Sequence, residues 1–257
     1  DCDESSTINA DNEADCDLEG DLDNFIGSVD QSNTAEALDF SIIDQDNILG
    51  VVQTLDALNN CDGTDGNQAT CFNNGDDFTN LIGDIGKDNA ADLSSDAISE
   101  QLNELAIGQA ASLQNICAES NAGINQASCV NDDISNNVGP VTQTSFNTAG
   151  GEATTATNVQ SNEAQTAQAL SAVNSCSERE AGDNLVSCDN IATNDIDSIT
   201  QTNTGQVADD FVQTNLIGVI GQDLEATNDC DERGEGDNVD GVDQSCNNEV
   251  ENTVGPV

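Results

Sequence analysis

Four residue types are missing from this chain of 257 residues, which contains no His, Met, Trp or Tyr and only six Phe. Basic residues are scarce as well: Lys87, Arg179 and Arg233 stand against 50 Asp and Glu, a formal net charge of −47. Because Lys and Arg neutralise phosphates, their scarcity excludes nucleic acid and anionic membrane surfaces as partners. Without His there is no Ser-His-Asp or Cys-His nucleophile and no imidazole ligand for a metal.

Long apolar runs are missing too, so the sequence predicts no membrane-spanning segment, which would need roughly 18 to 20 apolar residues. A chain that lacks Met and begins with Asp1 is expected to be a processed product, and the simplest processing is removal of a secretory signal. Ten Cys, an even number, fit an oxidising compartment. We therefore expect a secreted protein of the extracellular space or the cell surface.

The composition also argues against an enzyme. A carbohydrate-cleaving enzyme built on a β-helix would need two carboxylates at a fixed cleft, and no Asp or Glu stands out among 50. Aromatic platforms for sugars are few, since aromatic residues make up 2% of the chain. We expect a structural protein without catalytic residues.

The cysteines divide the chain into repeats. They form five successive pairs, and the first members of neighbouring pairs lie 54 to 59 residues apart. This period predicts one repeat array over residues 1–257. Its units are 1–60, 61–116, 117–175, 176–229 and a truncated 230–257. The pairs are Cys2/Cys16, Cys61/Cys71, Cys117/Cys129, Cys176/Cys188 and Cys230/Cys246.

Recurring residues occupy every second position before the first cysteine of a pair. Asn stands two positions before it and Gln eight positions before it, with Leu or Ala at the two even positions between them. The odd positions vary and carry Asp, Thr, Ser or Glu, as expected of a solvated face. Strand side chains alternate between two faces, so this period of two favours strands over helices. The recurring amides are Gln53, Gln109, Gln168, Gln222, Asn59, Asn115, Asn174 and Asn228.

Two more motifs recur within a unit. Gln-x-Asn occurs shortly before the strand with the recurring amides and again earlier in the unit, where Lys87/Asn89 and Gln143/Ser145 are imperfect copies. An apolar-Gly-x-apolar step precedes the earlier motif. A unit thus reads as a cysteine loop, a glycine step and two strands joined by a turn. The glycine steps are Ile26-Gly27-Ser28-Val29, Ile82-Gly83-Asp84-Ile85, Val138-Gly139-Pro140-Val141 and Val254-Gly255-Pro256-Val257.

Amides that recur at one strand position predict ladders inside the protein. A buried amide is costly unless its donor and its acceptor are both bonded. In units stacked about 4.8 Å apart, each amide would bond to the amides above and below it, as in cross-β stacks. The alternative is that these residues occupy turns, where Asn tolerates left-handed backbone. Turns would explain Asn beside the cysteines better than Gln in mid-strand.

These strands resemble a known family. The phrases Ile199-Thr-Gln-Thr-Asn-Thr-Gly, Val141-Thr-Gln-Thr-Ser and Val159-Gln-Ser-Asn-Glu-Ala-Gln look like the Gln/Asn repeats of curlin and Fap-type extracellular fibre subunits. Curlin-type repeats separate Asn from Gln by five residues, as Asn47 and Gln53 are separated here. The resemblance covers about half of each unit and leaves out the cysteine loops, the longer unit and the heavy acidity. It implies a secreted β-solenoid that polymerises into fibres.

The cysteine pairs predict local bridges. Neighbour pairing closes loops of 9 to 15 intervening residues, and each bridge would stabilise the fold by roughly 2 to 3 kcal/mol. Bridges between adjacent units are the alternative, because sequence alone does not fix the connectivity.

The loops between paired cysteines are rich in acid. Asp237, Asp240 and Asp243 flank Gly241 at the spacing of a calcium loop, although the twelve-residue EF-hand pattern with its closing Glu is absent. The alternative is a solvated acidic loop. Calcium is the one ligand that the sequence suggests, and we expect no other cofactor.

The sequence as a whole predicts an all-β fold, a repeat β-solenoid with local disulfide-closed loops. The alternative fold is a series of tandem β-sandwich modules with strand exchange between subunits. The first and last units are unmatched, and open strand edges that stack without closing generate filaments. We expect a structural subunit that polymerises with itself head to tail, and the alternative function is a monomeric acidic module that binds calcium or mineral.

Overall fold

The computed structural model confirms an all-β chain. It describes residues 2–4, 13–17, 23–37, 41–63, 68–73, 78–93, 97–119, 125–149, 157–178, 184–205, 210–232 and 243–257. This part of the chain consists of strands and short connections and contains no helix. It therefore has no helix that could cross a bilayer.

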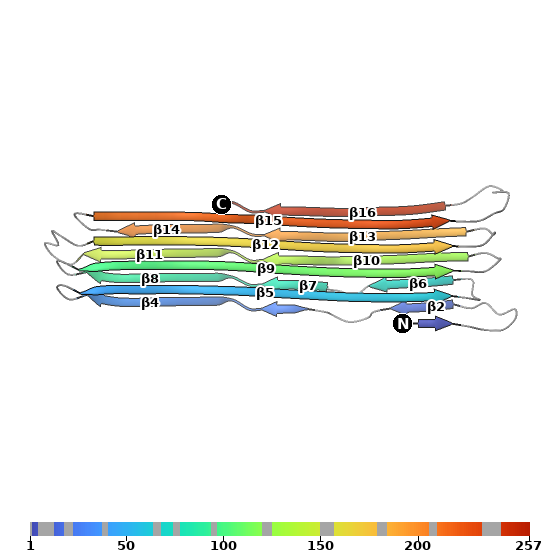
Figure 1. The fold of residues 1–257 in the computed structure, drawn as a ribbon, viewed down its shortest axis with the longest axis horizontal. Helices are drawn as coiled ribbons and strands as arrows, with labels where there is room; N and C mark the ends of the chain where they lie inside the picture. The colour runs from blue at the N-terminus through green and yellow to red at the C-terminus, as the bar shows by residue number, and fades with distance from the viewer. Residues whose placement is uncertain are drawn as a thin grey trace.

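The strands form three parallel sheets (Figure 1). Sheet A contains the long strands, β1 (Cys2–Glu4), β5 (Ile42–Gly63), β9 (Ile98–Glu119), β12 (Thr157–Glu178) and β15 (Asp210–Glu232). Sheet B contains β2 (Glu13–Asp17), β3 (Asn24–Ile26), β6 (Gln68–Asn73), β7 (Phe78–Ile82), β10 (Asn125–Val138), β13 (Asn184–Ile196) and β16 (Asp243–Val254). Sheet C contains β4 (Val29–Ala37), β8 (Ile85–Leu93), β11 (Val141–Ala149) and β14 (Ile199–Gly205).

Each strand pairs with the equivalent strand of the neighbouring unit. Cys117 of β9 pairs with Cys61 of β5 on one side and with Cys176 of β12 on the other. We call the strands at one level of the stack, such as β3, β4 and β5, a rung, and count rungs upward from the N-terminal end. Neighbouring parallel strands need a long crossover, and sheets B and C provide it by carrying the chain back to the start of sheet A. The prediction of strands rather than helices is confirmed for the recurring positions before Cys117, which lie in β9.

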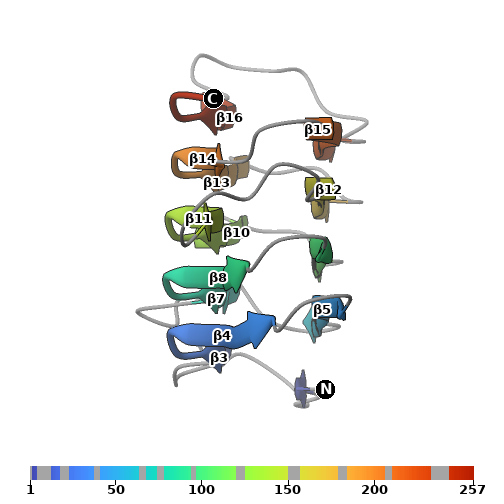
Figure 2. The same cartoon turned by 90° about the vertical axis from the view of Figure 1, so that its left-hand side faces the viewer.

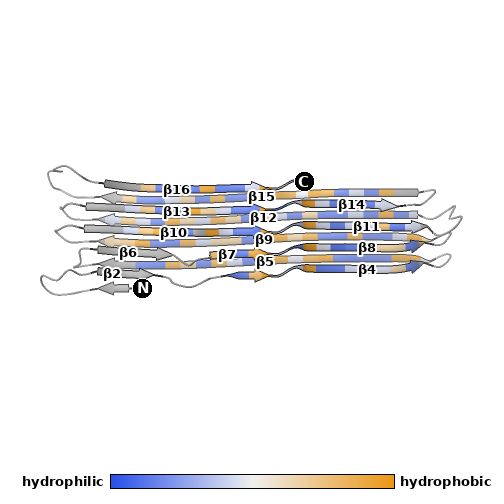
Figure 3. Ribbon diagram, turned by 180° about the vertical axis from the view of Figure 1, so that it is seen from behind, coloured by the Kyte–Doolittle hydropathy of each residue, from blue (hydrophilic) through white to orange (hydrophobic). Residues whose placement is uncertain are grey.

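The three sheets form two layers. Figure 2 shows sheet A on one side and sheets B and C together on the other, with the rungs stacked along one axis. Sheets B and C lie end to end and join at the glycine step. Apolar and polar positions align across neighbouring rungs, as at the apolar starts of β4, β8, β11 and β14 (Figure 3).

The core between the layers is thin and built from small aliphatics and amides. Leu105, Ile107, Val138 and Val141 pack together near the glycine step. A second cluster, with Phe78, lies toward the cysteines. In β9 and β12, the recurring side chains point inward and alternate with more exposed ones, as the period of two predicts.

The glycine step is a place of close backbone contact. A Cβ on Gly139 would lie 3.0 Å from the carbonyl carbon of Gly83 in the rung below. Gly139 N–H donates to Ile82 C=O at 2.8 Å, and Ile85 N–H donates to Pro140 C=O at 2.9 Å. The step thus turns the chain from sheet B to sheet C without interrupting the bonding between rungs.

A β-bulge explains an irregularity of the fourth unit, where Gln213 and Asn215 stand one residue too early. Ala164 pairs with Ile217 but Thr166 pairs with Ile220, so β15 holds one extra residue. The bulge restores the register at Gln222, which pairs with Gln168.

The outward face of sheet A differs from expectation. It was predicted to carry Asp, Thr, Ser and Glu, yet β5 also exposes large aliphatics. These positions vary between rungs because no neighbouring layer packs against them. The exposed side chains are Ile42, Ile48, Val52 and Leu58.

Candidate functional site

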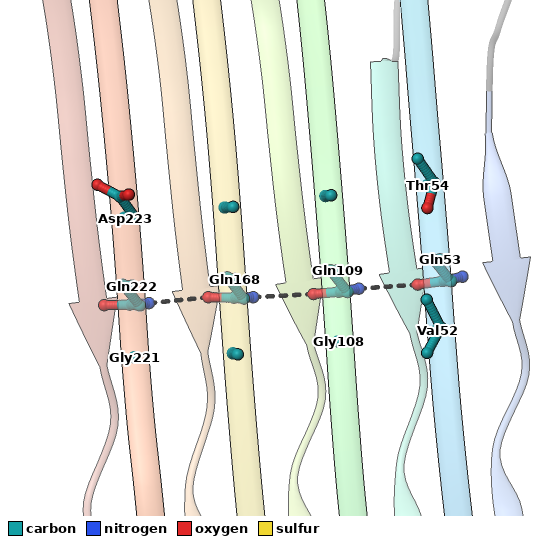
Figure 4. Close-up of a pocket in the computed structure, with 12 residues that line it drawn as sticks. Val52, Gln53, Thr54, Gly108, Gln109, Gln168, Gly221, Gln222 and Asp223 are labelled. Atoms are coloured by element: carbon teal, nitrogen blue, oxygen red, sulfur yellow. Dashed lines mark hydrogen bonds between the residues drawn. The ribbon is translucent and has the colours of Figure 1, made fainter.

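The most regular feature of the molecule is a column of glutamines in sheet A. Gln109 Nε2 donates to Gln53 Oε1 at 2.8 Å, Gln168 to Gln109 at 2.9 Å, and Gln222 to Gln168 at 2.9 Å (Figure 4). Gln109 and Gln168 are each 2% exposed. The four predicted glutamines therefore lie in one continuous line of hydrogen bonds along the stacking axis.

The same glutamines also join the two layers. Gln109 Nε2 bonds the backbone carbonyls of Asn80 at 2.9 Å and Asn137 at 3.0 Å, which lie in sheet B. Gln168 repeats this with Asn136 and Asp195 in the next rung. Each amide thus has partners above, below and opposite, which compensates the cost of its burial.

The predicted asparagines form a column as well. Asn115 Nδ2 donates to Asn174 Oδ1 at 3.1 Å, and Asn174 donates to Asn228 at 3.1 Å. Asn59 lies in register with Asn115 and is buried. Near the cysteines these side chains also bond across the layers, since Asn115 donates to Asn131 of sheet B at 3.0 Å.

Two asparagine columns of sheet B were missed by the sequence reading. The longest crosses five rungs, with donor–acceptor distances of 2.8, 2.8, 2.9 and 3.0 Å. Its signal is present in the sequence as Asn-x-apolar directly before each glycine step. The second column follows each cysteine loop by two residues. The members are Asn24, Asn80, Asn136, Asn194 and Asn252 in the first column, and Asn131, Asn190 and Asn248 in the second.

The two kinds of column have opposite directions. Wherever a glutamine bonds the equivalent glutamine of another rung, the donor lies in the upper rung, as in Gln222 to Gln168. Wherever an asparagine does so, the donor lies in the lower rung, as in Asn194 to Asn252. The stack therefore has a lower and an upper end that differ chemically. Further bonds that follow this rule are Gln101 to Gln45, Gln160 to Gln101, Gln201 to Gln143, Gln213 to Gln160, Asn33 to Asn89, Asn47 to Asn103, Asn103 to Asn162 and Asn162 to Asn215.

One column of sheet C contains a lysine. Gln31, Lys87, Gln143 and Gln201 stand in register. Lys87 is fully buried, and its Nζ donates to the backbone carbonyls of Asn47, at 3.1 Å, and Glu104. Gln143 Nε2 bonds the equivalent carbonyls one rung higher, so the ammonium occupies the place of an amide nitrogen.

Burial changes the chemistry of this lysine. Loss of water lowers the pKa of Lys87 from 10.5 to about 8, and the nearby Glu104 carboxylate partly opposes this shift. Lysine has three donors and no acceptor. Among the side chains that the structure describes, none bonds the buried Gln31 Oε1. Two rungs above Gln31, the equivalent acceptor Gln143 Oε1 does have a donor, because Gln201 donates to it at 2.8 Å.

Three disulfides join sheet A to sheet B within single units, namely Cys117–Cys129, Cys176–Cys188 and Cys230–Cys246. Neighbour pairing is confirmed for them, and unit-to-unit pairing of these six cysteines is wrong. The Sγ atoms of Cys117, Cys129 and Cys176 lie within 4.8 Å of one another, so the bridges stack as a further column. Cys2 pairs in register with Cys61 and Cys16 with Cys71, but their side chains lie outside the described part of the chain.

The predicted calcium loop stays a prediction. Asp237 and Asp240 lie outside the described residues, and of Asp243 only the backbone is described, where it begins β16. In the part of the chain that the structure describes, the clusters of three metal-ligating side chains consist of cysteines from the bridges above. These are bonded to one another as disulfides.

No protein-family model, curated protein or solved structure matches this chain. The resemblance to curlin and Fap-type repeats therefore stays a prediction from the strand motifs. Interpretation of the molecule rests on its amide columns, its edges and its charge.

Proposed function

We propose that this chain is a secreted β-solenoid that serves as the structural subunit of an extracellular or cell-surface filament. The observation that carries the proposal is the set of directional amide columns running through the stack from rung to rung. Columns of this kind are extended by adding one more rung at either end. Growth along one axis is therefore the activity for which the architecture is suited.

The edges of the sheets support self-association. The upper edge consists of β14, β15 and β16, and the lower edge consists of β1, β2, β3 and β4 (Figure 1). Open edges present backbone N–H and C=O groups that pair readily with another strand. A contact between unlike ends does not close on itself, so its repetition produces a linear polymer.

The charge supports an axial rather than a lateral assembly. A net charge of −47 makes subunits repel one another side by side. Backbone and amide bonds at an edge are short-ranged and neutral, and they tolerate this repulsion best when salt screens it. The Debye length falls from about 10 Å at 0.1 M salt to about 3 Å at 1 M, so assembly should be favoured by salt.

The disulfides support an extracellular location. Three bridges are present among the described residues, and such bonds persist in oxidising surroundings. They also reinforce a thin core that has few large side chains. The role that fits this combination is mechanical, with no catalytic step.

Sedimentation velocity and electron microscopy of the purified protein test the proposal. At about 0.1 M and 1 M NaCl, we expect unbranched filaments whose yield rises with protein and salt concentration. Fibre diffraction should show a meridional reflection near 4.8 Å, because the strands lie across the axis. Discrete particles of subunit mass under all these conditions would refute the filament.

A further inference from the structure

The three described disulfides form a core cluster of their own. Cys117, Cys129, Cys176 and Cys188 are fully buried and contact one another, and Cys230 packs against them. The aliphatic core residues belong to separate clusters. Successive bridges along the stack are therefore in contact with each other. We call them the lower, central and upper bridge, namely Cys117–Cys129, Cys176–Cys188 and Cys230–Cys246.

The central bridge touches a different neighbour through each of its two sulfurs. Cys176 Sγ lies within 4.8 Å of both sulfurs of the lower bridge. Cys188 Sγ lies within 4.8 Å of both sulfurs of the upper bridge. If the central bridge were open, each of its two thiols would thus lie against an intact disulfide.

A thiolate that lies against a disulfide can exchange with it. The thiolate forms a new S–S bond with one sulfur, the old S–S bond breaks, and the other sulfur leaves as a thiolate that takes up a proton. One disulfide and one thiol are present before and after the step, so it consumes neither an oxidant nor a reductant. The thiol has moved from one bridge to the next.

The backbone permits bridges along the stack as well as across it. The three bridges have Cα–Cα distances of 6.4, 6.7 and 6.9 Å, at the upper end of the usual range of about 4.4 to 6.8 Å. Cys117 and Cys176 pair in register in sheet A, and neighbouring strands lie about 4.8 Å apart, which is inside that range. Exchange between bridges therefore does not require the strands to separate.

We propose that the bridges form a relay for thiol–disulfide exchange, in which one thiol moves along the stack from bridge to bridge. The first thiol is a cysteine left unpaired during oxidation, or one released when a small thiol opens a bridge by forming a mixed disulfide with its other sulfur. Bridges that form wrongly during oxidation could then rearrange inside the folded stack until each lies within its unit. This inference goes beyond the proposed function and holds whether or not the chain forms filaments.

Two serine variants place a thiol on either side of the central bridge. Cys188→Ser leaves Cys176 against the lower bridge, and Cys176→Ser leaves Cys188 against the upper bridge. Each folded variant is kept free of oxygen and reductant at about pH 8.5, where an ordinary thiol is about half ionised. After several hours, the timescale of uncatalysed disulfide rearrangement, the thiols are trapped with N-ethylmaleimide in mildly acidic urea and located by peptide mass spectrometry.

We expect at least about a tenth of the label to leave the cysteine whose partner was replaced. In Cys188→Ser it should appear on a cysteine of the lower bridge, and in Cys176→Ser on a cysteine of the upper bridge. Label that stays on Cys176 in the first variant and on Cys188 in the second would overturn the relay.

A control separates exchange inside the stack from exchange through unfolding. Each variant keeps nine of the ten cysteines, an odd number, so one of them is a thiol. In concentrated urea at the same pH, the label should scatter over all nine, whereas in the folded variant it should reach the adjacent bridge first. A folded sample mixed with isotope-labelled protein should form no bridge between two chains. Scattering in the folded state, or bridges between chains, would contradict a relay within the stack.

The wild-type protein keeps the test decisive if a serine variant does not fold. A limiting amount of dithiothreitol is added to the folded protein, and the thiols are trapped as before. In partly reduced chains we expect bridges that join Cys176 to Cys117 or to Cys129. Partly reduced chains that contain bridges within units alone would refute the relay.

Discussion

The column that begins at Gln53 lies in sheet A, and the column that begins at Gln31 lies in sheet C and carries a lysine in its second rung. In the Gln53 column an amide stands in each of four rungs, and each amide bonds the one below it. In the Gln31 column the second rung carries Lys87, and the line of side-chain bonds resumes between Gln143 and Gln201. The Gln53 column bonds backbone carbonyls of sheet B, as Gln109 does with Asn80, and the Gln31 column bonds backbone carbonyls of sheet A, as Lys87 does with Asn47.

The difference shows what an amide column requires. A carboxamide offers donors and an acceptor at one point, so it can be repeated without limit. An ammonium reproduces the donors alone. Lys87 therefore preserves the bonds between layers and breaks the bonds between rungs, leaving Gln31 Oε1 buried without a partner among the described side chains.

Gln109→Leu should have the largest effect, because it breaks the continuous column. Gln53 Oε1 loses its donor, as do the carbonyls of Asn80 and Asn137. Each buried group left unpaired costs about 1 to 3 kcal/mol, so we expect a loss of about 3 kcal/mol or more in the free energy of unfolding, measured with urea on the monomer. Gln114→Leu, on the exposed face of the same strand, should change it by less than about 0.5 kcal/mol. Equal losses in the two variants would contradict the importance of the column.

Lys87→Gln should repair the interrupted column. The new amide can donate to Gln31 Oε1, accept from Gln143, and keep the carbonyls of Asn47 and Glu104 bonded. We expect a gain of about 1 to 2 kcal/mol in urea unfolding, which is the value of a buried bond plus a satisfied acceptor. Lys87→Met removes the charge but leaves both carbonyls without a donor, so it should be less stable than Lys87→Gln. If the Met variant matches the Gln variant, loss of charge rather than repair of the column is responsible.

The interrupted column should also make stability depend on pH. The pKa of Lys87 is lowered by burial to about 8 in the folded chain, against 10.5 when it is solvated. Between these values Lys87 binds more protons in the unfolded chain, so its contribution makes the free energy of unfolding rise with pH from about 8 to 10.5 and is constant at lower pH. Tyr is absent and Lys87 is the sole lysine, so no other side chain of these types titrates there. Urea midpoints at pH 7.5, 9 and 10 should rise for the wild type and stay level for Lys87→Gln.

Gln31→Met should have the smallest effect. The substitution removes the acceptor that lacks a partner and one long bond, from Nε2 to the Ile48 carbonyl at 3.3 Å. These two changes oppose each other, so we expect a shift within about 0.5 kcal/mol. Gln53→Met, at the same level of the continuous column, should cost more, because Gln53 Nε2 bonds two backbone carbonyls and its Oε1 accepts from Gln109. A larger loss for Gln31→Met would show that the column is not weakened beside Lys87.

Much of the sheet A architecture could be predicted from the chain. Parity of the recurring residues placed Gln53, Gln109, Gln168 and Gln222 on one strand face, and the structure aligns them. The columns of sheet B were missed, because Asn136 in β10 and Asn194 in β13 lie outside the motifs that the sequence analysis recognised. The calcium site predicted at Asp237, Asp240 and Asp243 stays a prediction, because Asp237 and Asp240 lie outside the described residues.

Lys87 illustrates the limit of reading motifs. By sequence it looked like a decayed copy of a glutamine, and nothing in the pattern said whether it faced water or the core. The structure buries it completely and gives it the two carbonyl partners of an amide. The bonding of Lys87 depends on two backbone carbonyls of sheet A that face it across the core. In the sequence, these carbonyls are 40 and 17 residues away from Lys87.

The sequence by itself determined the strand period, the phase of the units and which residues meet their equivalents, because these follow from repetition at fixed spacing, whereas the pairing of the three described bridges was decided by the structure. The two-layer arrangement, the opposite directions of the Gln and Asn columns and the role of Lys87 were decided by the tertiary structure. They depend on which backbone carbonyls face each amide across the core, and such contacts form between segments whose separation the repeat does not encode. The direction of the columns in turn gives the stack its two unlike ends.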